Sequence, residues 1–405
     1  MAGQAQGPQA RRSSLAPSLR TLAWTVLVLG LLLRTAPNVV DPGKAAVACD
    51  ANAYRALAES LAAGKGFTFD NPKLPPHCPP AQGPSHHWGP LLPMVEAAFI
   101  LPLGPTLLAL NAALVTLSLL TVAAAYWTTR DLFGPDAGLL VGAAVAVEWT
   151  SLVFGSRLGY SENLVLLTFV LTLWAILRSL RDERFILLAG AFAGLGYLSK
   201  ASMGWFFLIA GFGGLAWRVL HHGPRALRNR WYLGAIALFA TLAGLWNLRN
   251  LLLFWDGTPG GLLVDWQTSA YNAHVFAEAF HQPDRLLLGL TRRLPVLAIG
   301  LFLPLAFLLK PIGQEVRARY REEAASGLVL AAAIVFLLGW LFASAYWVVE
   351  NTRFWWADPI RYVAPALVPL LWLVCGRPGS AQRPLDWGFL YASSLAALAI
   401  SRFFL

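Results

Sequence analysis

Long apolar stretches separated by short polar segments run through almost the whole chain. A helix of about 20 mostly apolar residues crosses the roughly 30 Å hydrocarbon core of a bilayer. Eleven stretches approach this length, and they centre on residues 21–33, 106–126, 137–154, 164–176, 185–198, 203–215, 232–246, 294–309, 328–346, 363–374 and 387–400. The pattern therefore predicts an all-α polytopic membrane protein, a bundle of about eleven transmembrane helices.

A further apolar stretch, Leu91–Leu103, is too short to cross a bilayer. It carries the acidic Glu96 and runs into the sequence Pro-Leu-Gly-Pro, which ends a helix. We therefore predict a re-entrant or interfacial helix that begins and ends on the same side of the membrane.

The composition supports a chain that is partly solvated by lipid. Hydrophobic residues make up 57% of the 405 residues and charged residues only 13%. A soluble domain carries roughly a quarter charged residues, so a soluble or disordered class is excluded. The net charge of +10 does not require a nucleic-acid partner, because basic residues collect on the cytoplasmic loops of membrane proteins.

The distribution of basic residues predicts an N-terminus inside the cell. In this orientation more than half of the 31 Lys and Arg residues, including the clusters at 218–230 and 310–321, lie on short cytoplasmic loops. A full crossing by Leu91–Leu103 would move both clusters outside, which argues against it. The expected location is the plasma (inner) membrane, with the active site on the periplasmic or extracellular side.

The chain divides into a short tail and one long membrane domain. Residues 1–20 lack apolar periodicity and are expected to form a disordered cytoplasmic N-terminus. No small-x-small cleavage site follows the stretch 21–33, so it is interpreted as an uncleaved signal anchor. Residues 21–405 then form the transmembrane domain, in which residues 38–105 are a catalytic external loop with interfacial helices.

The external loop 38–105 contains one clear amphipathic pattern. Tyr54, Leu57, Leu61 and Ala62 fall at helical spacing with polar residues between them, which predicts a short helix at the membrane surface. Asp50 stands in front of it. This carboxylate has two compatible interpretations, the N-cap of the helix and a catalytic acid or base.

These residues resemble the first external loop of the GT-C membrane glycosyltransferases, which include the protein O-mannosyltransferases and the lipid A aminoarabinose transferases. The similarity rests on Asp50, on Tyr54, on Gly-Lys-Gly-Phe at 64–67 and on His-His-Trp-Gly-Pro-Leu-Leu-Pro at 86–93. Four later segments resemble further motifs of these enzymes in the same order. They are residues 156–162, 194–200, 245–250 and 358–365.

The resemblance implies a GT-C-like bundle that transfers a sugar, with inversion, from a polyprenyl-phosphate-linked donor to a protein, lipid or glycan acceptor. Asp50 is the candidate general base, supported by Glu162. Lys200, Arg249 and Arg361 lie at outer helix ends, where they bind the leaving phosphate or simply reach lipid headgroups. The remaining candidate substrate-binding residues are Tyr54, His86, His87, Arg157, Tyr160, Asn250 and Tyr362.

A divalent cation stays an open alternative. Many relatives carry a second acid directly after the first, whereas Ala51 and Asn52 follow Asp50 in this chain. A two-carboxylate metal site would therefore need Glu162 beside Asp50. His77, His86 and His87 with Asp50 are the alternative ligand set, although His87 beside Trp88 could equally hydrogen-bond a sugar or phosphate. No other cofactor is expected.

Two further features keep two interpretations each. Cys49 and Cys78 both lie in the external loop, where they form a disulfide or remain two unrelated thiols. Glu148 lies inside the stretch 137–154, where an acid is either functional or hydrogen-bonded within the bundle.

Two other functions compete with sugar transfer. A transporter or flippase for a lipid-linked or anionic substrate would place paired charges near the bilayer midplane, often beside broken helices. A non-catalytic membrane scaffold would leave the acids and bases at the outer edge without a role. The expected partners are the lipid-linked donor, its acceptor and membrane lipids, and no nucleic acid.

Overall fold

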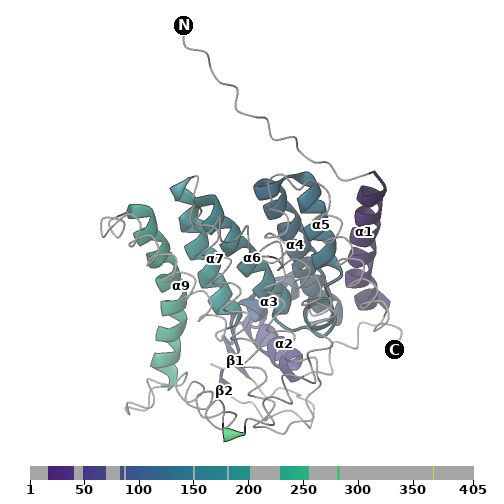
Figure 1. Cartoon of the computed structure of the whole chain (residues 1–405). Helices are drawn as coiled ribbons and strands as arrows, with labels where there is room; N and C mark the ends of the chain where they lie inside the picture. The colour runs from purple at the N-terminus through teal and green to yellow at the C-terminus, as the bar shows by residue number, and fades with distance from the viewer. Residues whose placement is uncertain are drawn as a thin grey trace.

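A row of helices that run alongside one another forms the body of the protein (Figure 1). The computed structural model describes residues 17–40, 49–69, 83–85, 88–148, 151–179, 182–200, 229–254, 281–282 and 368. The row contains α1 (Pro17–Val40), α5 (Pro135–Ala146), α4 (Leu107–Phe133), α6 (Glu162–Ser179), α7 (Ile186–Ser199) and α9 (Arg230–Phe254), in this spatial order. The described part is thus mainly helical, as predicted.

Four of the described helices are long and apolar enough to cross a membrane. They comprise residues Arg20–Val40, Leu107–Phe133, Glu162–Ser179 and Arg230–Leu253, and each covers a predicted stretch. Helix α1 begins at Pro17 and so takes in the end of the segment 1–20 that we expected to be disordered. Apart from residue 368, the predicted stretch 203–215 and all those after residue 290 lie outside the described residues, so the count of eleven stays a prediction.

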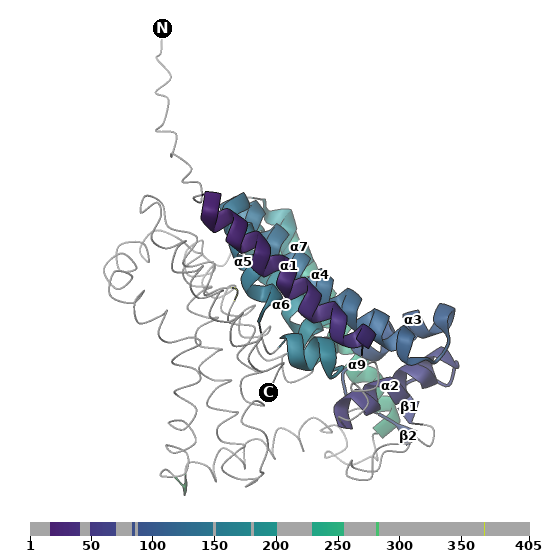
Figure 2. The same ribbon diagram turned by 90° about the vertical axis from the view of Figure 1, so that its right-hand side faces the viewer.

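Two shorter helices, α2 (Cys49–Ala62) and α3 (Leu91–Leu103), lie together at one end of the row (Figure 2). Ala58 of α2 packs against Ala97 and Ile100 of α3 and against Ala109 at the start of α4. Helix α3 therefore lies beside the start of α4 without crossing to the other end of the bundle, as its length predicted.

A minimal hairpin covers the outer face of α2. Strands β1 (Thr68–Phe69) and β2 (Gly83–Pro84) pair antiparallel, with Thr68 opposite Pro84. Phe69 is buried against Ala53 and Leu57 of α2. The amphipathic helix predicted from the spacing of its apolar residues is thus confirmed, with its apolar face turned partly toward this hairpin.

The predicted span 137–154 is not one continuous helix. Helix α5 ends at Ala146, and a π-helix, η2 (Ser151–Arg157), follows the break. Glu148 lies in the break, where its carboxylate accepts a hydrogen bond of 2.6 Å from the backbone N–H of Ser151. The apolar pattern is interrupted there by Glu148, Thr150 and Ser151, and the local contact between Glu148 and Ser151 lies in this interruption.

Polar contacts mark the end of the row that lies away from α2. Arg20 of α1 pairs with Asp136 of α5 at 2.8 Å, and Trp174 of α6 donates to Asp131 of α4 at 3.0 Å. Glu183, in the short 3-10 helix η3 (Glu183–Phe185), accepts from Asn229 just before α9 at 2.7 Å. The loops joining these helices therefore lie opposite the end that holds α2 and the hairpin.

Candidate active site

The first turn of α2 presents Asp50 at the end of the bundle that holds the hairpin. We expected this residue in front of the helix, but the helix begins at Cys49, so Asp50 lies inside its first turn. A carboxylate is favoured there because the exposed N–H groups carry partial positive charge. Its Oδ1 accepts a hydrogen bond of 3.5 Å from the indole Nε1 of Trp88.

Tyr54 follows one helical turn later on the same face of α2 as Asp50. Its ring is 5% exposed and packs with Leu92, Leu114 and Leu164 from three other helices. The phenol hydroxyl lies 3.5 Å from Oγ of Ser161. Tyr54 therefore ties α2 to the residue that precedes α6.

Glu162 begins α6 and forms an ion pair with Lys200, the residue that directly follows α7. The Nζ atom of Lys200 lies 3.3 Å from Oε1 of Glu162. The side chain of Lys200 is 19% exposed and that of Glu162 is 6% exposed. Because the pair is largely withdrawn from water, each charge depends on the other for compensation.

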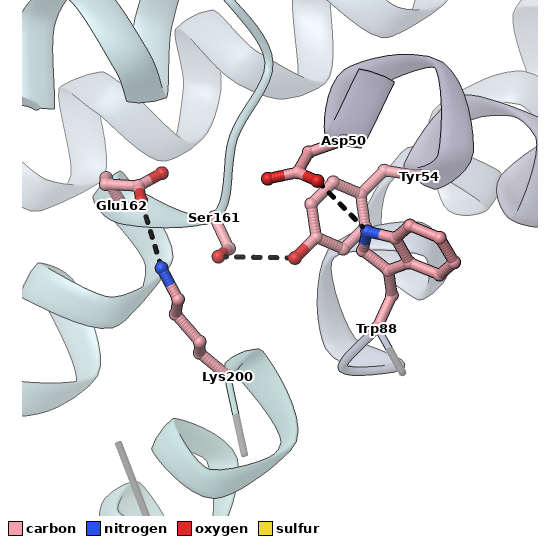
Figure 3. A network of polar contacts seen from close by, with 6 residues as sticks. All are labelled: Asp50, Tyr54, Trp88, Ser161, Glu162 and Lys200. Atoms are coloured by element: carbon pink, nitrogen blue, oxygen red, sulfur yellow. Dashed lines mark hydrogen bonds and ion pairs between the residues drawn. The ribbon is translucent and has the colours of Figure 1, made fainter. Parts of the chain in front are cut away.

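The six residues Asp50, Tyr54, Trp88, Ser161, Glu162 and Lys200 form one polar cluster, which we call the outer cluster (Figure 3). They come from α2, from the segment before α3, from the start of α6 and from the end of α7. Figure 3 shows the carboxylate groups of Asp50 and Glu162 on either side of the Tyr54–Ser161 contact. The fold thus brings both predicted acids and one predicted phosphate-binding cation to one place.

Two glycines allow the segments of the outer cluster to approach one another. A Cβ atom on Gly89 would collide with the carbonyl oxygens of Leu198 and Ser199 at the end of α7. Gly159 has a φ of +75°, and a Cβ atom there would lie 3.4 Å from that of Ala51. The segment that contains Trp88 is therefore held close to the end of α7, and the segment before α6 is held close to α2.

Arg249, predicted to bind phosphate, contacts the hairpin. Its guanidinium donates to the carbonyl oxygens of Phe67, at 2.9 Å, and Ser85, and to Oδ1 of Asn250 at 2.7 Å. It also lies over the ring of Trp246, 4.8 Å from the centroid. In this arrangement Arg249 fixes the hairpin to α9, and Asn250 helps to orient the guanidinium.

Several predicted residues cannot be placed in the site. His86, His87, Arg361, Tyr362 and Cys78 lie outside the described residues, so the disulfide and four contacts stay predictions. The structure describes only the backbone of Arg157, in η2, and of Cys49, at the start of α2. Tyr160 is partly exposed beside the outer cluster.

The cation site at Asp50 and Glu162 stays a prediction. Within the described residues, no group of three or more His, Cys, Asp or Glu side chains is arranged to hold a metal ion. A cation at Asp50 and Glu162 would need ligands from other parts of the chain or from the substrate.

A small cavity lies beneath α2, lined by Asn52 and Arg55 together with Glu96 of α3 and Asn111 of α4. Within the described part of the chain, Oε2 of Glu96 and Oδ1 of Asn111 have no hydrogen-bond partner. Burial raises the pKa of Glu96 to about 8, against opposition from Arg55. Burial therefore favours the protonated form of Glu96.

Sequence reasoning missed one charged residue, Arg34 of α1. Its side chain is fully buried between α1, α4, α5, η2 and α6. The available signal was an arginine that directly follows the apolar stretch 21–33, and that position is equally typical of a residue that reaches the membrane surface.

Comparisons with known proteins agree with this architecture. Residues 88–246 match the model of the dolichyl-phosphate-mannose-protein mannosyltransferase family. No curated protein matches the chain in sequence.

The fold is similar to that of ArnT from Cupriavidus metallidurans. The structure of ArnT bound to undecaprenyl phosphate is 15% identical over 88% of this chain and 59% of its own, with a TM-score of 0.54. The apo structure is 14% identical over 93% and 58% of the two chains, with a TM-score of 0.52. The chain thus spans about three-fifths of the length of ArnT. The family match covers residues 88–246 and the likeness to ArnT is one of fold, and both agree with the resemblance of the sequence to the GT-C glycosyltransferases.

Proposed function

We propose that this protein is an inverting membrane glycosyltransferase that uses a polyprenyl-phosphate-linked sugar as its donor. The acceptor is a protein, lipid or glycan at the outer face of the plasma membrane. The observation that carries the proposal is the outer cluster, in which Asp50 of α2 and the Glu162–Lys200 pair meet through the Tyr54–Ser161 contact.

The chemistry requires a base beside the attacking acceptor and a cation beside the leaving phosphate, on opposite sides of the anomeric carbon. The Asp50 carboxylate takes the proton of the acceptor nucleophile as the bond to the anomeric carbon forms. The bond from this carbon to the phosphate oxygen breaks at the same time, and its electron pair leaves with the polyprenyl phosphate. The ammonium of Lys200 stabilises the negative charge that develops there.

Glu162 serves this scheme by holding Lys200. The carboxylate is 6% exposed, and the ammonium is 3.3 Å away, so the cation is held in place before the donor arrives. A preorganised charge stabilises a developing anion better than one that must first reorient. Arg249 contributes through the hairpin that it holds against α9.

The match to a mannosyltransferase family and the fold shared with ArnT, a protein seen bound to undecaprenyl phosphate, support a lipid-linked donor. The end of the bundle away from α2 carries Arg20, Arg130, Arg178, Arg184 and Arg230. Because such an end faces the cytoplasm, the outer cluster belongs on the opposite side.

The transporter alternative gains one observation, since Arg34 and Glu148 lie in the bundle beside the broken helix α5–η2. However, all three guanidinium nitrogens of Arg34 already donate to side chains and carbonyls of the protein. A substrate site needs donors that are released to the substrate, so we favour transfer over transport.

Purified protein in lipid vesicles, supplied with a labelled polyprenyl-phosphate sugar and candidate acceptors, tests the proposal. We expect the label to leave the lipid and appear on the acceptor. Movement of the intact labelled lipid between the two leaflets, with no loss of sugar from it, would identify a flippase instead.

A further inference from the structure

Arg34 is a charged residue inside the bundle whose hydrogen-bonding capacity is fully used. Its side chain has no solvent-exposed surface. Nε donates to the carbonyl of Ala146 at 2.8 Å, and Nη2 donates to the carbonyl of Val145 and, at 2.7 Å, to Ser151. Nη1 donates to Ser118 at 2.7 Å and to Asn163 at 3.2 Å.

These contacts cluster where α5 stops. A helix end leaves its last carbonyl groups without partners inside the helix. Arg34 satisfies two of these groups, those of Val145 and Ala146, and so stabilises the break. Gly30, one turn earlier in α1, makes the approach possible, because a Cβ atom there would lie 2.6 Å from that of Ala146.

The same guanidinium also fixes both ends of the segment that leads to the outer cluster. Ser151 begins η2, and Asn163 directly follows Glu162 in α6. Asn163 donates in turn to Ser156 at 3.1 Å, and Ser118 bridges to Ser156 at 2.6 Å. The π-helix is therefore closed onto the start of α6 around Arg34.

A second residue of α1 strengthens this connection. Asn38, one turn after Arg34, donates to the backbone carbonyl of Ser156 at 2.9 Å. Asn111 of α4 donates to the carbonyl of Asn38 at 3.2 Å. Helix α1 thus holds η2 at two successive turns.

A buried arginine costs several kcal/mol of desolvation unless its charge and its donors are compensated. Here the hydroxyl, amide and carbonyl partners compensate the donors, and the carboxylate of Glu148 lies near enough to compensate the charge. No donor of the Arg34 guanidinium is directed at a ligand, so the role of Arg34 is to hold the surrounding segments in place.

We propose that Arg34 is a positioning residue that sets the place of Ser161 and Glu162 relative to α2, and hence relative to Asp50. This inference rests on the proposed function for its catalytic consequence. Its structural content, that Arg34 fixes the 151–163 segment against α2, is independent of that function.

Arg34→Lys tests the inference while it keeps the positive charge opposite Glu148. A lysine ammonium is a single point with three donors and cannot reach α4, α5, η2 and α6 together. Because misplacement by about 1 Å costs up to about 10²-fold in rate, we expect kcat to fall by about 10- to 10²-fold. Binding of the donor lipid should change much less. Thr172→Val is the matched control, since among the described residues the buried Thr172 hydroxyl bonds only the carbonyl of Thr168 in its own helix.

A cross-linking measurement reports position without any need for activity. In a background with Ser at Cys49, Cys78 and Cys375, Ala51→Cys and Gly159→Cys would place two Cβ atoms about 3.4 Å apart, close enough for a disulfide. A cysteine at position 159 must adopt a positive φ. This strain is present in every protein that is compared, so it does not affect the comparison of rates. We expect copper-phenanthroline to form this bond several-fold more slowly when Arg34→Lys is added, and at an unchanged rate when Thr172→Val is added.

The outcomes separate the two claims. Unchanged cross-linking in Arg34→Lys, or slower cross-linking with an unchanged kcat, overturns the inference. If the parental protein transfers no sugar from any polyprenyl donor, the proposed function fails, and cross-linking alone then decides whether Arg34 fixes the segment. Should Arg34→Lys not yield folded protein, Ser156→Ala removes a hydroxyl at the centre of the same network and should give the same two changes at smaller size.

Discussion

Burial disfavours the negative charge of Glu162, and the nearby ammonium of Lys200 stabilises that charge. Lys200→Met leaves the 6% exposed carboxylate without this partner, so we expect a lower Tm and a stability loss of about 1–3 kcal/mol. Donor binding and turnover should both weaken, because a phosphate contact exists before and during reaction. These changes can be measured by thermal unfolding and by binding of labelled donor.

The double variant Lys200→Met/Glu162→Gln separates the two roles of the pair. Removing both charges should recover most of the stability, since no buried charge is then left unpaired. Donor binding should stay weak. Recovery of donor binding in the double variant would show that Lys200 does not contact the phosphate.

Glu96 predicts a pH dependence of stability. Its pKa rises from 4.5 to about 8 on burial, so the folded protein binds one more proton than the unfolded chain between these values. Stability from this group therefore decreases as the pH rises from about 4.5 to about 8. Glu96→Gln should remove this component, which comparison of Tm at pH 5 and pH 8 detects. An equal fall in Tm for the variant and the parent would contradict it.

The order of short motifs in the sequence was enough to select Asp50, Tyr54, Glu162 and Lys200, which the fold brings into one cluster. It was not enough to separate a phosphate ligand from a residue that holds a loop. Arg249 has the charge and location expected of a ligand, and two of its partners are carbonyls of the hairpin. Those partners are more than 160 residues away in the chain, where no local pattern reports them.

At the level of elements, close packing of α7 on α9 depends on glycine. A Cβ atom on Gly190 would overlap the carbonyl oxygen of Ala235, whereas one on Gly244 of α9 would meet nothing within 4 Å. Gly190→Ala should therefore lower stability by about 1–3 kcal/mol, through forced separation of the helices. Gly244→Ala should be neutral or slightly stabilising, because alanine favours the helix. Thermal unfolding of both variants in one detergent checks the difference.

Apolar periodicity predicted the presence of the described helices better than their ends. Helix α4 extends to Phe133, beyond the predicted 106–126, because Gly134 and Pro135 supply the stop and the next start. The break after Ala146 was not predictable in this way. It depends on Arg34, which is distant in sequence and donates to the last carbonyls of α5.

For the whole molecule, the two ends of the bundle predict its orientation. Between residues 17 and 254, the residues that the structure describes place α2, the hairpin and the outer cluster at one end and five arginines at the other, so the arginine end should be cytoplasmic. Reporter fusions after Arg230 and after Glu323 should both give cytoplasmic activity. An external signal from either fusion contradicts the topology.

The central claim is that Asp50 is the base of a sugar transfer, and Asp50→Asn tests it most directly. The amide keeps the shape of the carboxylate but cannot accept the proton, so transfer in lipid should fall by about 10²- to 10⁴-fold. Binding of the labelled polyprenyl-phosphate sugar should survive. Glu59→Gln, which alters an exposed carboxylate on the same helix that pairs with Arg55, should leave transfer unchanged. Transfer by Asp50→Asn at the parental rate would contradict the account and reduce Asp50 to a stabilising residue in the first turn of α2.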